Sequence, residues 1–218
     1  TCALPWAGLA DCYSTLGSWD DGYFPPREVM PNALAAVSKA LEVDSTLAEV
    51  HAALAYIKTH YEWDWSGAER ECQEALRLNP GFAGTYRWYS QLLVAQARFA
   101  ESLLASQQCL RLDHLDVTYN NHLGWHFYHA RQYDAALNQF QKALELDPHS
   151  VWTQIEMGRA YEQKQMYDEA IDAFAQVISA THSSFPVAGL GHAYALAGHR
   201  AKAMLQLQEL AHRATQVY

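Results

Sequence analysis

Apolar side chains of matched size recur at a fixed interval along the second half of the chain. Residues 121–148 and 155–178 align at an offset of 34 positions, and each aligned pair keeps its size class. The aligned pairs are Leu123 with Met157, Gly124 with Gly158, Phe127 with Tyr161, Tyr133 with Tyr167, Ala136 with Ala170, and Phe140 with Phe174. Self-similarity at this kind of period predicts a stack of repeated supersecondary units.

These residues resemble the tetratricopeptide repeat family, whose unit of the same length is a pair of antiparallel helices. The resemblance implies an all-α fold, a right-handed superhelical solenoid of about six antiparallel helix pairs. It also gives the glycines a packing role, because small residues are needed where two helices cross closely. Gly124, Gly158 and Gly191 are therefore expected at close helix crossings instead of in a phosphate-binding loop.

The register extends over nearly the whole chain, which predicts a single array covering residues 1–218. The expected repeats are 3–47, 48–82, 83–116, 117–150, 151–183 and 184–217. The second repeat fits if one residue is inserted in its turn, and the first has a turn enlarged by about eleven residues near 18–30. Long loops in compact arrays are often functional, but this insertion has a simpler alternative role in routing the chain.

Composition narrows the choice of partners. The chain has 15 Lys and Arg against 24 Asp and Glu, a formal net charge of −9, and this balance disfavours direct binding of nucleic acid. No apolar stretch reaches the roughly 18 residues of a membrane-spanning helix, and the N-terminus lacks the pattern of a signal peptide. The missing initiator Met suggests a processed chain or an excised fragment. We expect a cytoplasmic location, with a periplasmic one open if the full-length protein has a membrane anchor.

The family resemblance implies that certain positions of each first helix line a concave groove. Aromatic and Arg side chains are common at binding surfaces because they bury a large area. We expect a protein or peptide partner to bind there; the alternative is that the Trp side chains only pack between neighbouring repeats. The candidate residues are Arg87, Asn121, Trp125, Tyr128, His129, Trp152 and Arg159.

The sequence gives less support to a catalytic or a metal-binding function. His122, His126 and His129 lie on one helical stripe, a spacing that zinc sites use, but no Asp, Glu or Cys at ligand spacing completes a shell. No GxSxG, P-loop or HExxH motif occurs. Cys12, Cys72 and Cys109 take inward-facing positions, where thiols are usually inert. We therefore predict no enzyme activity, no cofactor and no metal.

The run from AGLADCY through FPPREVMPNALAAVSKALEVD to LAEVHAALAYIKTHYEWDWSGAERE resembles the C-terminal repeat arrays of large bacterial signalling proteins. That resemblance implies a regulatory scaffold module, without indicating which output domain is attached. Two alternatives stay open: a small-molecule sensor, and self-association as a homodimer. The second follows from the C-terminal repeat, where Leu205, Leu207 and Leu210 lack an obvious polar capping helix.

Overall fold

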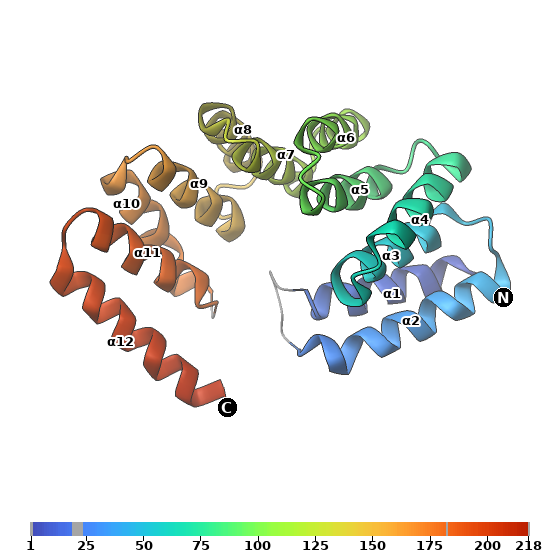
Figure 1. Cartoon of the computed structure of the whole chain (residues 1–218), viewed down its shortest axis with the longest axis horizontal. Coiled ribbons are helices and arrows are strands. Elements are labelled where there is room, and N and C mark those ends of the chain that lie inside the picture. The colour runs from blue at the N-terminus through green and yellow to red at the C-terminus, as the bar shows by residue number, and fades with distance from the viewer. Residues whose placement is uncertain (1, 19–23, 182, 218) are drawn as a thin grey trace. The chain divides into compact units, whose positions relative to one another are not determined.

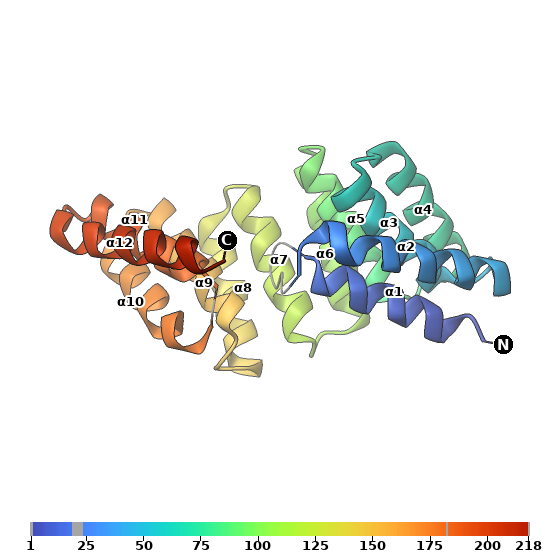
Figure 2. The ribbon, with the colours of Figure 1, turned by 90° about the horizontal axis from the view of Figure 1, so that it is seen from below.

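The computed structural model describes residues 2–18, 24–181 and 183–217, and over these residues the chain is all-α, without strands. It divides into two compact units, Thr1–His114 (unit 1) and Leu115–Tyr218 (unit 2). Figures 1 and 2 show that consecutive helices within each unit form antiparallel pairs. The prediction of an all-α array of six helix pairs is confirmed. None of the described helices is long and apolar enough to cross a membrane.

Unit 1 contains three helix pairs, one in each of the first three expected repeats. Its helices are α1 (Leu4–Leu16), α2 (Pro26–Val43), α3 (Ala48–Ile57), α4 (Trp65–Leu78), α5 (Ala83–Ala95) and α6 (Phe99–Leu112). The insertion expected near 18–30 is partly helical, because α2 begins at Pro26, where a proline suits the first helical position. Residues 19–23 of that insertion lie outside the described residues.

The extra residue of the second repeat lies at the end of its first helix. There α3 continues into a π-helical turn, η1 (Lys58–Glu62), in which the backbone N–H of Trp63 donates to the carbonyl of Lys58. A π-turn holds one more residue per hydrogen-bonded ring than an α-turn. The insertion is therefore absorbed within the helix, and the turn that follows keeps the geometry of its neighbours.

Unit 2 contains the other three pairs. Its helices are α7 (Val117–His129), α8 (Tyr133–Leu146), α9 (Val151–Gln163), α10 (Tyr167–Val177), α11 (Phe185–Leu196) and α12 (Arg200–Val217), with a short 3-10 turn, η2 (Ile178–Ala180), after α10. Gly124 and Gly158 lie at close crossings, as the sequence predicts. A Cβ on Gly124 would meet the Phe140 ring at 2.4 Å, and one on Gly158 would meet the Phe174 ring at 2.7 Å.

The turns inside the second to fifth helix pairs repeat as regularly as the helices. Trp63, Ala97, Arg131 and Gln165, spaced 34 residues apart, all adopt positive φ between 58° and 61°. In the turn at Arg131, the backbone N–H of Arg131 donates to the carbonyl of Tyr128 at 2.9 Å, which ends α7. The left-handed residue reverses the chain, so the second helix packs back on the first.

The inward-facing prediction for the cysteines is right for two of the three. Cys72 and Cys109 are buried, but Cys12 is exposed. Cys12 lies in α1, and no described helix precedes α1 to cover that side as the first helix of a preceding pair would. The repeat register thus assigns the right face but overestimates its burial in the first pair.

Candidate functional site

The first helices of the three pairs in unit 2 share a continuous surface, which we call the α7–α9–α11 face. It consists of Asn121, Trp125, Tyr128 and His129 on α7, Trp152, Arg159 and Glu162 on α9, and Phe185 and His192 on α11. Spacings of three, four and seven residues place each set on one side of its helix. Six of the seven candidate residues predicted from the sequence belong to this face.

Contacts between neighbouring helices make this face continuous. The amide nitrogen Nδ2 of Asn121 donates to Oγ1 of Thr153 at 2.9 Å, which joins α7 to α9. The ring of Trp152 meets that of Phe185 edge-on, with centroids 5.8 Å apart, which joins α9 to α11. Trp152 is partly buried, so it packs between repeats and also contributes to the face.

An aromatic cluster occupies the α7 part of the face. The rings of Trp125 and His129 are 4.1 Å apart and those of Tyr128 and His129 are 5.3 Å apart, both in edge-on geometry. All three side chains are half-buried. Burial, aided by the nearby Arg159 charge, lowers the pKa of His129 to about 4. Its Nε2 atom is buried without a hydrogen-bond partner among the described residues. The cluster is thus neutral and rigid at neutral pH.

Arg159 is the cation of this face. Its guanidinium lies 4.9 Å from the centroid of the Tyr128 ring, within the range of a cation–π contact. Its Nη1 atom donates to both carboxylate oxygens of Glu156, at 2.9 and 3.1 Å. Glu156 is 4% exposed, and burial raises the pKa of its carboxyl, while Arg159 opposes that shift. The carboxylate of Glu156 therefore holds the guanidinium of Arg159 in one position.

The seven candidate residues predicted from the sequence do not include two acidic residues that matter here, Glu156 and Glu162. Glu156 lies three residues before Arg159 on the same helix, a spacing that favours an ion pair and was available as a signal. Glu162 approaches Nδ1 of His192 on α11 at 3.1 Å. The two residues are 30 positions apart and lie on different helices, so no short-range spacing in the sequence indicates this pair.

Arg87 lies in unit 1, apart from the six candidates that unit 2 brings together. Its guanidinium covers the ring of Trp88 at 4.2 Å from the centroid. Trp88 in turn meets the ring of Tyr56 edge-on at 4.5 Å and packs against the core of unit 1. Arg87 thus has the same kind of aromatic support as Arg159, on the first helix of its own repeat.

The histidine stripe on α7 has the packing expected of side chains inside a helix bundle. The Trp125 ring meets that of His126 at 5.0 Å and that of His129 at 4.1 Å. His126 is 1% exposed, and burial lowers its pKa to about 3. Among the described residues, no group of three His, Cys, Asp or Glu side chains is arranged to hold a metal ion.

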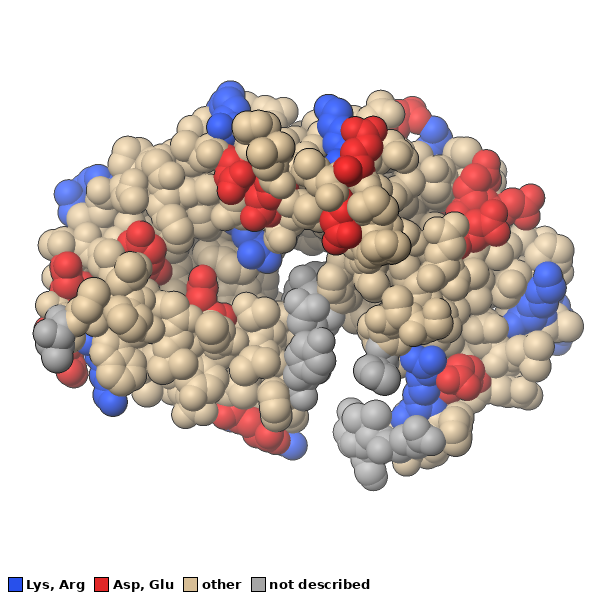
Figure 3. Space-filling view, turned by 180° about the vertical axis from the view of Figure 1, so that it is seen from behind, with Lys and Arg blue, Asp and Glu red and all other residues tan. Residues whose placement is uncertain are grey.

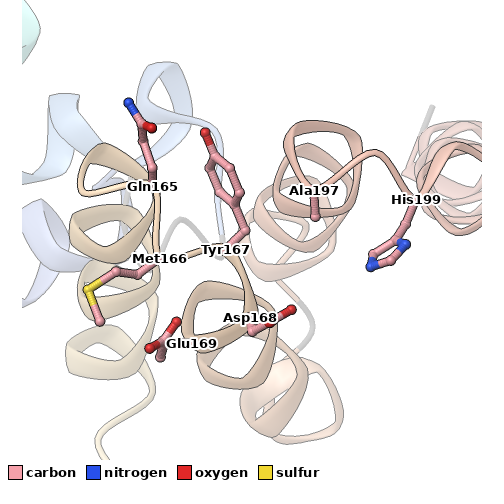
Figure 4. A pocket seen from close by; sticks show the side chains of 7 residues that line it. All are labelled: Gln165, Met166, Tyr167, Asp168, Glu169, Ala197 and His199. Carbon is pink, nitrogen blue, oxygen red and sulfur yellow. The ribbon is translucent and has the colours of Figure 1, made fainter.

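A depression of about 390 Å³ lies between the turns that lead into α10 and α12 (Figure 4). It is lined by Gln165, Met166, Tyr167, Asp168, Glu169, Ala197 and His199. Its lining is mostly polar, whereas small-molecule sites are usually lined by apolar side chains with a few polar ones. The depression therefore lacks the features of a ligand pocket, and the α7–α9–α11 face is the stronger candidate.

Charged side chains are dispersed over the surface seen in Figure 3, where Lys and Arg lie singly or beside Asp and Glu. The pairing is visible in the contacts: Arg98 binds Glu69 and Glu101, and Lys164 binds Asp134. On the described residues of this view, cationic side chains do not gather into a patch of the kind that phosphate backbones require.

Comparisons with known proteins agree with the repeat register. A family model of the tetratricopeptide repeat matches residues 127–187. Among curated proteins, protein bimA of Emericella nidulans is 27% identical over 164 residues, covering 72% of this chain and 20% of that protein. The chain thus spans about a fifth of the length of this relative.

Solved structures share the fold over most of the chain. PilW, a type IV pilus biogenesis factor, matches with a TM-score of 0.78 at 17% identity, covering 95% of this chain and 91% of PilW. YrrB, described as a TPR protein with an unusual peptide-binding site, matches with a TM-score of 0.57 at 23% identity, covering 82% of this chain and 92% of YrrB. The tetratricopeptide repeat model matches residues 127–187, and the 34-residue register and the paired helices extend the same pattern beyond that match over the described residues.

Proposed function

We propose that the chain is a non-catalytic scaffold whose α7–α9–α11 face binds a peptide segment of a protein partner. The tetratricopeptide repeat fold is typical of protein-interaction scaffolds. The observation that carries the proposal is the set of half-buried aromatic side chains on that face, with the guanidinium of Arg159 against the ring of Tyr128. Such groups dominate the energetics of protein interfaces.

The rigidity of the face supports this proposal. Binding is weakened by the entropy lost when long side chains are ordered, about 0.5–1.5 kcal/mol for each. Arg159 is already fixed by Glu156 and Tyr128, and Trp125 is already packed against His129. A peptide that docks here would therefore order few additional groups. Asn121, by contrast, donates to Thr153, so its role in binding would use its remaining polar atoms.

A pull-down with the double variant Trp125→Ala/Trp152→Ala tests the proposal. We expect the wild-type chain to retain partners that the double variant loses, while far-ultraviolet circular dichroism shows the same helix content for both. Trp65→Ala is the matched control, because Trp65 lies in unit 1 and is 37% exposed. A double variant that folds and keeps every partner would contradict a binding role for this face.

Self-association through the C-terminal repeat is a second proposal, favoured by the exposure of α12. Leu205 is 61% exposed, Leu207 57% and Met204 47%, on a helix that packs against α11. Exposed apolar side chains on a terminal repeat favour contact with another surface. We expect Leu205→Glu/Leu207→Glu to abolish any dimer seen by light scattering. A wild-type chain that stays monomeric at high concentration would refute this second proposal.

The wider setting is also a proposal. The resemblance of the N-terminal half to repeat arrays of large bacterial signalling proteins supports a regulatory module within a longer cytoplasmic protein. Mass spectrometry of the native protein, detected with an antibody against this chain, would give its full length. A native polypeptide of the same length as this chain would contradict a module within a larger protein.

A further inference from the structure

The C-terminal end of the α7–α9–α11 face carries an unbalanced set of charges. Glu156 and Glu162, both on α9, share a single guanidinium, that of Arg159. Arg159 hydrogen-bonds Glu156 through Nη1, and it acts on Glu162 through space. Glu162 is hydrogen-bonded instead to His192, whose imidazole is charged only when protonated. Helix α9 thus carries two carboxylates and one guanidinium.

Glu162 has a carboxylate of low exposure, and the lysine nearest to it along the chain is already paired. The nearest Lys along the chain, Lys164, binds Asp134 on α8. Glu162 has a side-chain exposure of 9%, and burial raises the pKa of its carboxyl, with His192 and Arg159 opposing the shift. A carboxylate of low exposure interacts more strongly with a nearby charge than one in bulk water. Unit 2 as a whole adds to the imbalance, with seven Lys and Arg against ten Asp and Glu.

Helix ends and aromatic rings of this face also favour a cation. Tyr128 and His129 occupy the last turn of α7, and Glu162 occupies the last turn of α9. The C-terminal end of a helix carries a partial negative charge, so cations are favoured beside it. The faces of aromatic rings such as Trp125 and Tyr128 also attract cations, and Tyr128 already binds one in Arg159.

We infer that the partner segment presents a Lys or Arg side chain, which docks beside Glu162 at the C-terminal ends of α7 and α9. This inference rests on the proposed function, since it names the chemistry of the peptide that the face binds. The incoming cation pairs with the carboxylate that Arg159 leaves unbalanced and lies against the aromatic cluster. The site would discriminate against acidic peptides, because an acidic side chain there would be repelled by the Glu162 carboxylate and by the partial negative charges of two helix C-termini.

A selection from a random dodecapeptide phage library on the whole chain provides the probe. We expect the peptides recovered to be enriched in Lys or Arg, and the strongest is then synthesised with its basic residue kept, or replaced by Gln or by Glu. Fluorescence anisotropy should show roughly tenfold weaker binding for the Gln peptide and a larger loss for the Glu peptide, in line with the cost of losing one close charge pair. Added NaCl should weaken the binding of the basic peptide.

Variants of the protein separate this inference from the proposed function. Glu162→Gln should weaken the basic peptide about tenfold and leave the Gln peptide unchanged. Glu145→Gln makes the same change at an exposed residue of α8 and should weaken the binding of neither peptide. Some peptides could lose affinity for the Trp125→Ala/Trp152→Ala variant but bind Glu162→Gln as tightly as the wild type. That result would overturn the inference of a basic partner segment and would leave the peptide-binding function supported. A folded chain that selects no peptide overturns both.

Discussion

The two units pack the same helix pair with side chains of different size. In unit 2, Gly124 has no side chain, and the ring of Phe140 fills the space beside it. The corresponding residues 34 positions earlier, in unit 1, are Ser90 and Ser106, which are both buried. Protein interiors are filled to nearly constant density, so a smaller residue on one helix is matched by a larger one on the other. The two repeats therefore fill this helix crossing with different pairs of side chains, a glycine under an aromatic ring in unit 2 and two buried serines in unit 1.

Two histidines, one in each unit, have pKa values that folding shifts in opposite directions. In unit 2, burial keeps His126 neutral and lowers its pKa to about 3. In unit 1, Nδ1 of His51 lies 2.8 Å from a carboxylate oxygen of Glu71, and this hydrogen bond raises the pKa of His51. Folding thus disfavours the proton on one histidine and favours it on the other. The two units should respond to pH with opposite signs through these groups.

Loss of the Phe140 ring should have the largest effect. Phe140→Ala leaves a cavity beside Gly124, and we expect a loss of about 3–5 kcal/mol in unfolding free energy. Urea unfolding followed by circular dichroism measures it. Phe99→Ala in unit 1 is the control, because Phe99 is 37% exposed and should cost far less. Equal losses for the two variants would show that the Gly–Phe packing carries no special weight.

The substitution Gly→Ala should have opposite signs in the two units. A Cβ at Gly158 would lie 2.7 Å from the Phe174 ring, so Gly158→Ala should cost about 1–3 kcal/mol through overpacking. Gly8 lies inside α1 with no atom within 4 Å of the added Cβ. Gly8→Ala should therefore stabilise the chain by about 0.5–1 kcal/mol, because alanine favours the helix. Melting temperatures that shift in the same direction would contradict this contrast.

Acidification should destabilise unit 2 through His126. The pKa of this group is about 3 in the folded chain and about 6.5 when unfolded, so its contribution is complete above pH 6.5 and falls as pH decreases toward 3. Between pH 6.5 and pH 5 we expect a loss of about 1.5–2 kcal/mol from this one group. Urea midpoints measured across that range test the loss. His126→Phe removes this titrating group and should reduce the pH dependence to the part that other groups such as His129 contribute; an unchanged slope in a folded variant would contradict the assignment.

The fold was predictable from the sequence because its determinants are local and repeated. Gly124 and Phe140 lie in one helix pair, and their spacing recurs 34 residues later at Gly158 and Phe174. The charges of the candidate site were harder to predict. The partner of Glu162 is His192, on the first helix of the next repeat, and that pairing depends on the side chain each helix happens to present there. The repeat register predicts which positions face a neighbouring helix. It does not predict which polar side chains form hydrogen bonds at those positions.

The smallest expected effect concerns the His51–Glu71 pair of unit 1, where the pH dependence is reversed. Because the pKa of His51 is raised in the folded chain, its contribution is complete below the unfolded pKa of about 6.5 and is lost as pH rises through the folded pKa. The pair is partly exposed, so we expect His51→Gln to cost at most about 1 kcal/mol at pH 6. The difference between wild type and variant should shrink at pH 8. If it grows as pH rises, the hydrogen bond to Glu71 does not stabilise the protonated imidazole, and the two units share one response to pH.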